Sequence, residues 1–209
     1  MIRRLTVSVA MFAFAGLILV ISVLRTASVK YEFTGVVNGV DTAATDSEMV
    51  VNYDLAFPGK VMPDSPFWGV KAVRDKLWLI TTTNDTREAE LLLLLADKRI
   101  AASKIFFERG NPEDGYETLL KAEHYLILAR EKLNENVANG LDQSRFATHL
   151  ATASLKHREV IEKQILPLAP DDARPEIVQT LDTTKQTFEQ TTHVLNQLSL
   201  PIPDNPFNG

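Results

Sequence analysis

The sequence predicts an all-α protein with an N-terminal transmembrane helix, a flexible stalk and an elongated antiparallel bundle of about five helices. An uncharged run of twenty residues near the N-terminus predicts the first of these elements. Apolar residues that recur at helical spacing from residue 57 to residue 200 predict the bundle. Short breaks rich in Pro, Gly, Asn and Asp divide this pattern into separate helices. With 209 residues, the chain is long enough for one compact domain with attachments.

The first 28 residues are expected to be a signal anchor. Residues 5–24 carry no charge, and a helix of that length spans the roughly 30 Å hydrocarbon core of a bilayer. Arg3 and Arg4 precede the run, whereas acidic residues dominate the rest of the chain. The positive-inside tendency therefore places the N-terminus in the cytoplasm and the body outside the cell membrane, as a single-pass protein.

A cleaved signal peptide is the alternative reading of the same segment. Signal peptides have apolar cores of about 7–15 residues followed by a site of small residues. Here the apolar run is longer, Arg25 stands where a cleavage region would begin, and residues 26–28 make a poor site. Under either reading the body faces outward. Residues 29–56 mix Val, Gly, Thr, Asp and Asn without a lasting period, so they are expected to form a flexible linker.

The bundle domain is expected over residues 57–200. Its first helix begins within "PDSPFW" at residues 63–68, where Ser65 is placed to cap the helix and Pro66 to occupy the first helical position. In the second helix, Asp85 and Glu88 have capping-box spacing. The second to fifth helices are expected at residues 85–109, 112–139, 142–166 and about 175–198, the last with a heptad pattern typical of a coiled coil. Because the connections are short, neighbouring helices are expected to run antiparallel. Residues 201–209 are expected to form an extended tail.

The stretches "FPGKVMPDSPFWGVKAVRDKLW" and "REAELLLLLADKRI" resemble a bacterial family catalogued only as a domain of unknown function. Members of that family are similar in a P-G-then-P-D-x-P opening, a K-x-x-R-[DE] first helix and an A-D-K-R second helix. The resemblance covers residues 57–130, with one residue more than expected before Pro63. It implies an extracytoplasmic helical domain behind a signal or anchor, and it implies no activity. These features fall here on Pro58, Gly59, Pro63, Asp64, Pro66, Lys71, Arg74, Asp75, Asp97, Lys98 and Arg99.

Charged residues cluster on the first two bundle helices, at Lys71, Arg74 and Asp75 and at residues 97–99. We expect Asp75 and Asp97 each to pair with a base on the adjacent helix and so to fix the packing, in preference to an anion-binding site. Trp68 and Trp78 lie ten residues apart, on different faces of the first helix. Packing against the second helix is the expected role of both, and an aromatic ligand cleft is the alternative.

Three histidines are weak candidates for a metal site. His149 and His157 are eight residues apart and share one side of the fourth helix, and His124 could face them across the bundle with Glu123 or Glu159 nearby. The pattern lacks an H-x-x-x-H or E-x-x-H pair, which would place two ligands on adjacent turns. We therefore predict no metal and no cofactor.

Composition and missing motifs limit the function. Outside the first 28 residues the chain has 19 basic residues against 27 acidic ones, which disfavours nucleic acid. It has no cysteine, no nucleophile elbow and no phosphate-binding loop, so we do not expect an enzyme. We expect a membrane-anchored helical module that binds a protein partner or envelope component, or self-associates. A metal- or stress-responsive periplasmic module of the chaperone kind is the alternative.

Overall fold

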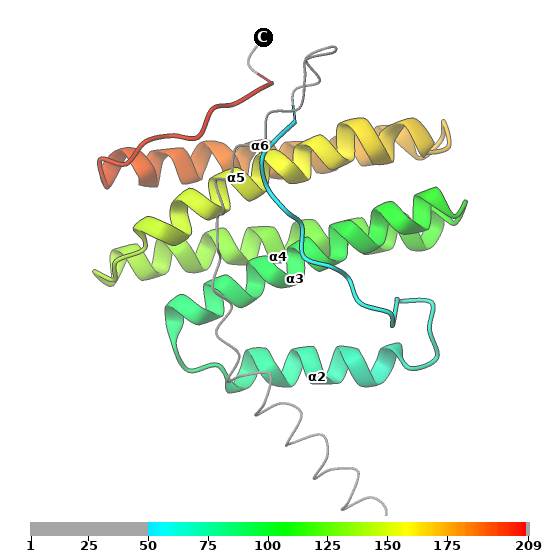
Figure 1. The fold of residues 1–209 in the computed structure, drawn as a ribbon, viewed down its shortest axis with the longest axis horizontal. Coiled ribbons are helices and arrows are strands. Elements are labelled where there is room, and N and C mark those ends of the chain that lie inside the picture. Colours follow the sequence, from blue (N-terminus) through cyan, green and yellow to red (C-terminus); the bar gives the residue numbers. More distant parts are fainter. Residues whose placement is uncertain (1–49, 208–209) are drawn as a thin grey trace, which may run out of the picture. The chain divides into compact units, whose positions relative to one another are not determined.

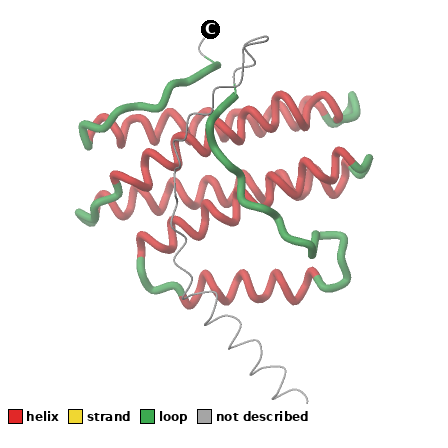
Figure 2. Tube along the Cα trace, viewed as in Figure 1, coloured by secondary structure: helices red, strands yellow, loops and turns green. Residues whose placement is uncertain are grey.

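The computed structural model describes residues 50–207, and within that range the protein is all-α, as predicted. No strand occurs among these residues (Figure 2). The predicted membrane helix and most of the predicted linker, residues 29–49, lie outside the described residues. The helices are α2 (Trp68–Thr81), α3 (Asp85–Glu108), α4 (Pro112–Ala138), α5 (Ser144–Val160) and α6 (Arg174–Gln197), with a π-helical turn (Ile161–Ile165) and a 3-10 turn (Leu166–Leu168) after α5.

The described residues fall into two compact units. The larger unit contains α3, α4, α5 and α6 together with the chain that leads into α2 and the first residue of that helix, Trp68. The rest of α2, from Gly69, belongs to the smaller unit. Within the larger unit, successive helices run antiparallel because only a few residues connect them (Figure 1). The pairs α3–α4 and α5–α6 share the most extensive contacts.

One apolar cluster in the core of the larger unit lies where α3, α4, α6 and the end of α5 meet. Ile100, Leu119, Ile161, Ile165 and Ile177 are fully buried there, in one cluster with Phe107, Ala122, Val160, Ala169 and Leu181. One polar contact also joins the first two helices, since the Ser103 hydroxyl of α3 donates a 2.7 Å hydrogen bond to the Gly115 carbonyl of α4. Because its members come from four elements, this cluster fixes the positions of the helices that carry the site described below.

Asparagine side chains begin α3 and α4. The Asn84 side chain accepts a 2.9 Å hydrogen bond from the Arg87 amide, so the cap of α3 lies one residue before the predicted Asp85. Asn111 caps α4 with Pro112 at its first position, so α4 begins at residue 112 as predicted. The prediction for α2 was early, because this helix begins at Trp68. Ser65 lies in the preceding turn, where its hydroxyl accepts from the Phe67 amide at 3.3 Å.

Three helices end in the same left-handed turn. Gly110 and Gly140, with φ of 74° and 76°, follow α3 and α4, and Ser199 with φ of 55° occupies this position after α6. In each case the next amide returns to a carbonyl of the last helical turn, for example Leu200 N to Leu195 O at 2.9 Å. A serine in the left-handed region carries a steric cost that glycine avoids.

We therefore predict that Ser199→Gly stabilises the protein by about 1 kcal/mol. Urea unfolding of the variant beside the parent chain measures this. Ser144→Gly, at the start of α5, where the backbone is helical, should destabilise by about as much. Equal midpoints for Ser199→Gly and the parent would contradict the strain at residue 199.

The fourth bundle helix is shorter than predicted. Residues 142–166 were expected to form one α-helix, but α5 ends at Val160 and a π-turn and a 3-10 turn carry the chain to Leu168. Pro167 explains the change, because its ring lacks an N–H and crowds the carbonyl four residues earlier. A wider turn relieves that crowding. The residues of this wider turn still contribute Ile161 and Ile165 to the core.

The C-terminal residues 201–207 run in an extended path, as Figure 1 shows in red. Near their end the Phe207 ring lies 4.2 Å from the Arg158 guanidinium carbon, a cation–π contact with α5. Arg158 also donates a 2.8 Å hydrogen bond to Glu162. The proline-containing segment "PDNPF", residues 203–207, therefore ends in contact with α5.

Within residues 50–207, no helix has both the length and the apolar character needed to cross a membrane.

Candidate functional site: a buried ionic cluster

Ionisable side chains from four separate segments meet in the larger unit. Asp97 comes from α3, Glu123 from α4 and His157 from α5, and Tyr53 comes from the extended residues 50–56, which we call the strap. Asp97, Glu123 and His157 are all buried, with His157 0% exposed. His149 of α5 adds a partly buried ring beside Tyr53. We call these five residues the buried cluster.

His157 is the centre of the buried cluster. Its Nε2 lies 3.1 Å from Asp97 Oδ1 and its Nδ1 lies 3.2 Å from Glu123 Oε1. Burial alone lowers the pKa of His157, but hydrogen bonds to Asp97 and then Glu123, with their negative charge, outweigh burial and raise the pKa to about 9. His157 is therefore an imidazolium at neutral pH and donates to both carboxylates. Burial raises the pKa of Glu123, and its bond to His157 opposes that rise.

Tyr53 extends the buried cluster to the strap. Its hydroxyl donates a 2.7 Å hydrogen bond to Asp97 Oδ2. Burial, followed by the charge of Asp97 and this hydrogen bond, raises the pKa of Tyr53, so the phenol keeps its proton. His149 Nε2 lies 3.3 Å from the same hydroxyl, and burial lowers the pKa of His149. Because the Tyr53 proton is given to Asp97, neutral His149 donates its Nε2–H to the Tyr53 oxygen.

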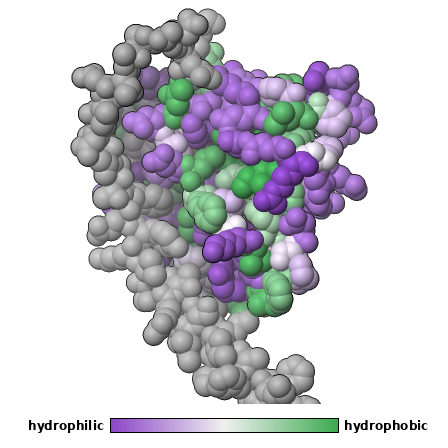
Figure 3. All heavy atoms as spheres, turned by 45° about the vertical axis from the view of Figure 1, so that its right-hand side comes forward, coloured by the Kyte–Doolittle hydropathy of each residue, from purple (hydrophilic) through white to green (hydrophobic). Residues whose placement is uncertain are grey.

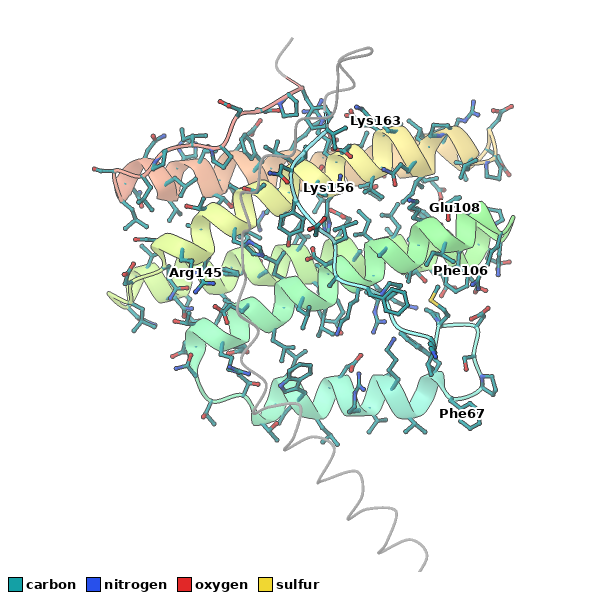
Figure 4. All side chains as sticks on the ribbon, in the orientation of Figure 1. Phe67, Phe106, Glu108, Arg145, Lys156 and Lys163 are labelled. Atoms are coloured by element: carbon teal, nitrogen blue, oxygen red, sulfur yellow. The ribbon has the colours of Figure 1, made fainter. Side chains whose placement is uncertain are left out.

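A second polar contact holds the strap two residues earlier. The Val51 amide donates to Glu159 Oε2 at 2.5 Å, and the Val51 carbonyl accepts from Lys156 Nζ at 3.3 Å. Lys156 and Glu159 also pair with each other at 2.7 Å. Figure 4 shows Lys156 on α5 beside the strap, which is drawn in cyan. Residues 50–56, placed in a flexible linker by the sequence analysis, are thus fixed on α5 and α3.

We predict that Tyr53→Phe destabilises the protein by about 2 kcal/mol, because Asp97 stays buried and loses a hydrogen bond to a charged acceptor. The ring contact with His149, 5.0 Å between centroids, is kept in this variant. Urea unfolding measures the loss, and hydrogen exchange of the Val51 amide should become faster. Tyr125→Phe is the matched control, since Tyr125 lies outside the buried cluster. Similar unfolding midpoints for the two variants would contradict this role of Tyr53.

The structure changes the predicted partner of Asp97. We expected a base on the first bundle helix, and the strong partners are Tyr53 and His157 instead. In α2, Arg74 Nη2 pairs with Asp75 Oδ1 at 2.6 Å on the same helix. The Arg99 guanidinium carbon lies 4.3 Å from the Trp68 ring centroid, which gives Trp68 a packing role.

The remaining residues of the predicted motif have structural positions. Lys71 lies in α2 and Lys98 in α3, both half-buried. Pro58, Gly59, Pro63, Asp64 and Pro66 lie in the non-helical chain that leads to α2, where Gly59 has a φ of 88°. That conformation favours glycine. Figure 3 shows that the molecular face drawn there mixes apolar and polar residues.

The three candidate metal ligands are not brought together. His157 has a carboxylate at each ring nitrogen, and His149 is bonded to Tyr53. His124 is exposed, with its ring 6.2 Å from that of Tyr125. Across residues 50–207, no group of three or more His, Asp or Glu side chains is arranged to hold a metal ion.

The buried cluster is a charge network whose members bond mainly to one another, and the second carboxylate oxygen of Glu123, Oε2, is buried without a hydrogen-bond partner. A general acid or base must come within hydrogen-bond reach of a substrate, and His157 has no exposed surface. The imidazolium supplies one positive charge between two carboxylates that would otherwise be buried without a counter-charge. The arrangement therefore joins α3, α4, α5 and the strap.

The fold and the site define an all-α module whose helices surround a buried ionic cluster. The chain belongs to the family described as Domain of unknown function (DUF5667), whose profile matches residues 60–200. The match includes the three helices of the buried cluster and begins after the strap. A search of curated proteins and a search of solved structures each gave no match.

Proposed function

We propose that this protein is a membrane-anchored, extracytoplasmic helical module that acts by binding a protein or an envelope component, without catalysing a reaction. The observation that carries this proposal is the closed buried cluster. His157 and Tyr53, whose pKa values are both raised, both bond to Asp97 and are turned toward the interior of the module. Perturbed groups at enzyme active sites instead line a cleft that a substrate enters.

The membrane and export parts of the proposal rest on the sequence. The uncharged residues 5–24 have the length of a bilayer span, and arginines precede them. The strap begins at residue 50 and is fixed to α5 by Val51. A short span of chain therefore separates a membrane segment from a folded unit, which is the layout of a displayed module.

Crosslinking in intact cells tests the binding role. The full chain at its native level is treated with an amine-reactive crosslinker, and we expect discrete larger species that contain it. The control adds the reagent only after solubilisation in denaturing detergent, which should abolish these species. Recovery of the free monomer alone from intact cells would contradict the proposal.

Cysteine labelling tests the location, since the chain has no cysteine of its own. Gln179→Cys places a single thiol on the exposed surface of α6. A membrane-impermeant maleimide should label it in intact cells from which any outer barrier has been opened. Labelling only after lysis of the cell membrane would contradict the outward orientation. The mass of the labelled protein also separates a retained anchor from a cleaved signal peptide.

The metal- or stress-responsive alternative is not advanced further. A metal would have to displace the carboxylates on His157 or the tyrosine on His149, and His124 lies on the exposed side of α4. No other observation favours that reading.

A further inference from the structure

Helix α2 presents apolar side chains to solvent along one side. Val70, Val73 and Ile80 are 62%, 54% and 68% exposed, although residues of this type usually lie in a core. With 100° per residue, these three and Leu77 fall within an arc of about 80° on the helix. Phe67, 70% exposed immediately before the helix, is labelled in Figure 4. We call Val70, Val73, Leu77 and Ile80 the apolar stripe.

Basic residues border the apolar stripe on both sides. Lys76 is exposed next to one edge, and Arg74, which pairs with Asp75 and whose side chain is 33% exposed, lies next to the other. α2 has three basic residues and a single acid, Asp75, whereas the whole chain carries a net charge of −5. The helix is therefore a positive and apolar element in an acidic protein.

We propose that α2 lies on an anionic lipid surface, with the apolar stripe in the interface between headgroups and acyl chains. An interfacial helix has this composition, because apolar side chains enter the interface and flanking Lys and Arg reach the anionic headgroups. With 14 residues, α2 is too short to cross a bilayer, so it lies along the surface. The inference deepens the proposed function and rests on the membrane anchor to keep the module near lipid.

A second copy of the chain fits the stripe less well. Spacings of three and four residues between stripe members would also suit a coiled coil, but α2 offers only two heptads where three or four are needed. The residues flanking the stripe would be Gly69, Arg74, Lys76 and Thr81. Two copies would bring bases toward each other with no acid at these positions. An anionic lipid surface supplies the missing negative charge.

Single-cysteine labelling of the full chain tests the inference. Val73→Cys, and Gln179→Cys on α6 as the control, each receive an environment-sensitive fluorophore and are reconstituted into vesicles of equal parts phosphatidylcholine and phosphatidylglycerol. We expect a several-fold rise in emission at residue 73, with quenching by lipid-borne quenchers, and no such change at residue 179. Adding Lys76→Glu should weaken the lipid contact more than five-fold, since one Lys near such a surface is worth about five-fold in binding.

Three outcomes would overturn the inference. A fluorophore at residue 73 that stays open to aqueous iodide shows that α2 is not on lipid. A fluorophore shielded from iodide but untouched by lipid-borne quenchers identifies a second copy or another protein as the occupant. A Lys76→Glu variant that behaves as the parent removes the charge argument. Flotation of the same vesicles reports separately whether the chain is anchored in lipid. A chain that floats with the vesicles while residue 73 stays open to iodide contradicts the inference about α2 and leaves the membrane anchor standing.

Discussion

Replacing His157 by leucine should cost about 3–5 kcal/mol of stability, the range measured when one partner of a buried ion pair is removed. The imidazolium lies between Asp97 and Glu123, at 3.1 and 3.2 Å, and is 0% exposed. Leucine fills much of the same volume, so the loss comes from the two carboxylates left buried without a cation. Urea unfolding followed by circular dichroism measures the change.

Two further variants separate this cause from general damage. His124→Leu alters an exposed histidine on α4 and should change stability by less than about 0.5 kcal/mol. Adding Asp97→Asn and Glu123→Gln to His157→Leu removes the buried charges, so the triple variant should regain about half of the lost stability. The triple variant also keeps the test open if the single variant fails to fold. A triple variant no more stable than His157→Leu would show that charge is not the cause.

The second large effect is a loss of stability with rising pH. The pKa of His157 is about 9 in the folded protein, against about 6.5 in an unfolded chain. Because the folded pKa is the higher one, the contribution is fully present below about pH 6.5 and is lost as the pH rises through 9. The size of that contribution is about 3 kcal/mol. Unfolding free energies measured at intervals from pH 6 to pH 9.5 test it.

Of the other shifted groups in the buried cluster, Glu123 acts in the same direction as His157, whereas His149, whose pKa is lowered by burial, acts in the opposite direction only up to about its unfolded pKa of 6.5. Burial raises the pKa of Glu123, so the folded protein binds its proton more tightly and stability also falls as that proton leaves. The raised pKa of Tyr53 matters only above the ordinary tyrosine range near 10. In His157→Leu the decline between pH 6.5 and 9.5 should become much smaller. An equal decline in both proteins would assign it to other groups.

The sequence predicts the helices well because residues close to each boundary determine where the helix begins and ends. Asn111-Pro112 begins α4, and Gly110 and Gly140 end α3 and α4, each through bonds to neighbouring residues. α3 begins at Asp85 as predicted, but its capping residue was displaced by one, to Asn84, because asparagine and aspartate both cap helices well. The expected end of the fourth helix at residue 166 was wrong, because α5 ends at Val160 and the π-turn before Pro167 depends on how the chain repacks around Ile161 and Ile165.

The buried cluster could be predicted only in part. His157 was placed on the same side of the fourth helix as His149, and Glu123 and Glu159 were named as neighbours of the histidines. The pairing of His157 with Asp97 joins residues 60 positions apart, and no local pattern encodes such a distance. Tyr53 carries no periodic signal at all, since an extended segment bound through one amide, one carbonyl and one hydroxyl needs no repeat. The only sequence feature that indicates the strap contact is a single tyrosine in a polar stretch.

The most direct test of the ionic cluster is the protonation state of His157 in the folded protein. Nitrogen-15 chemical shifts of the imidazole, assigned with His157→Leu, report whether each ring nitrogen carries a proton. At pH 7.5 both nitrogens should be protonated, and the ring should titrate only near pH 9. A neutral ring at pH 7.5, with one bare nitrogen, would mean that no cation stands between the carboxylates.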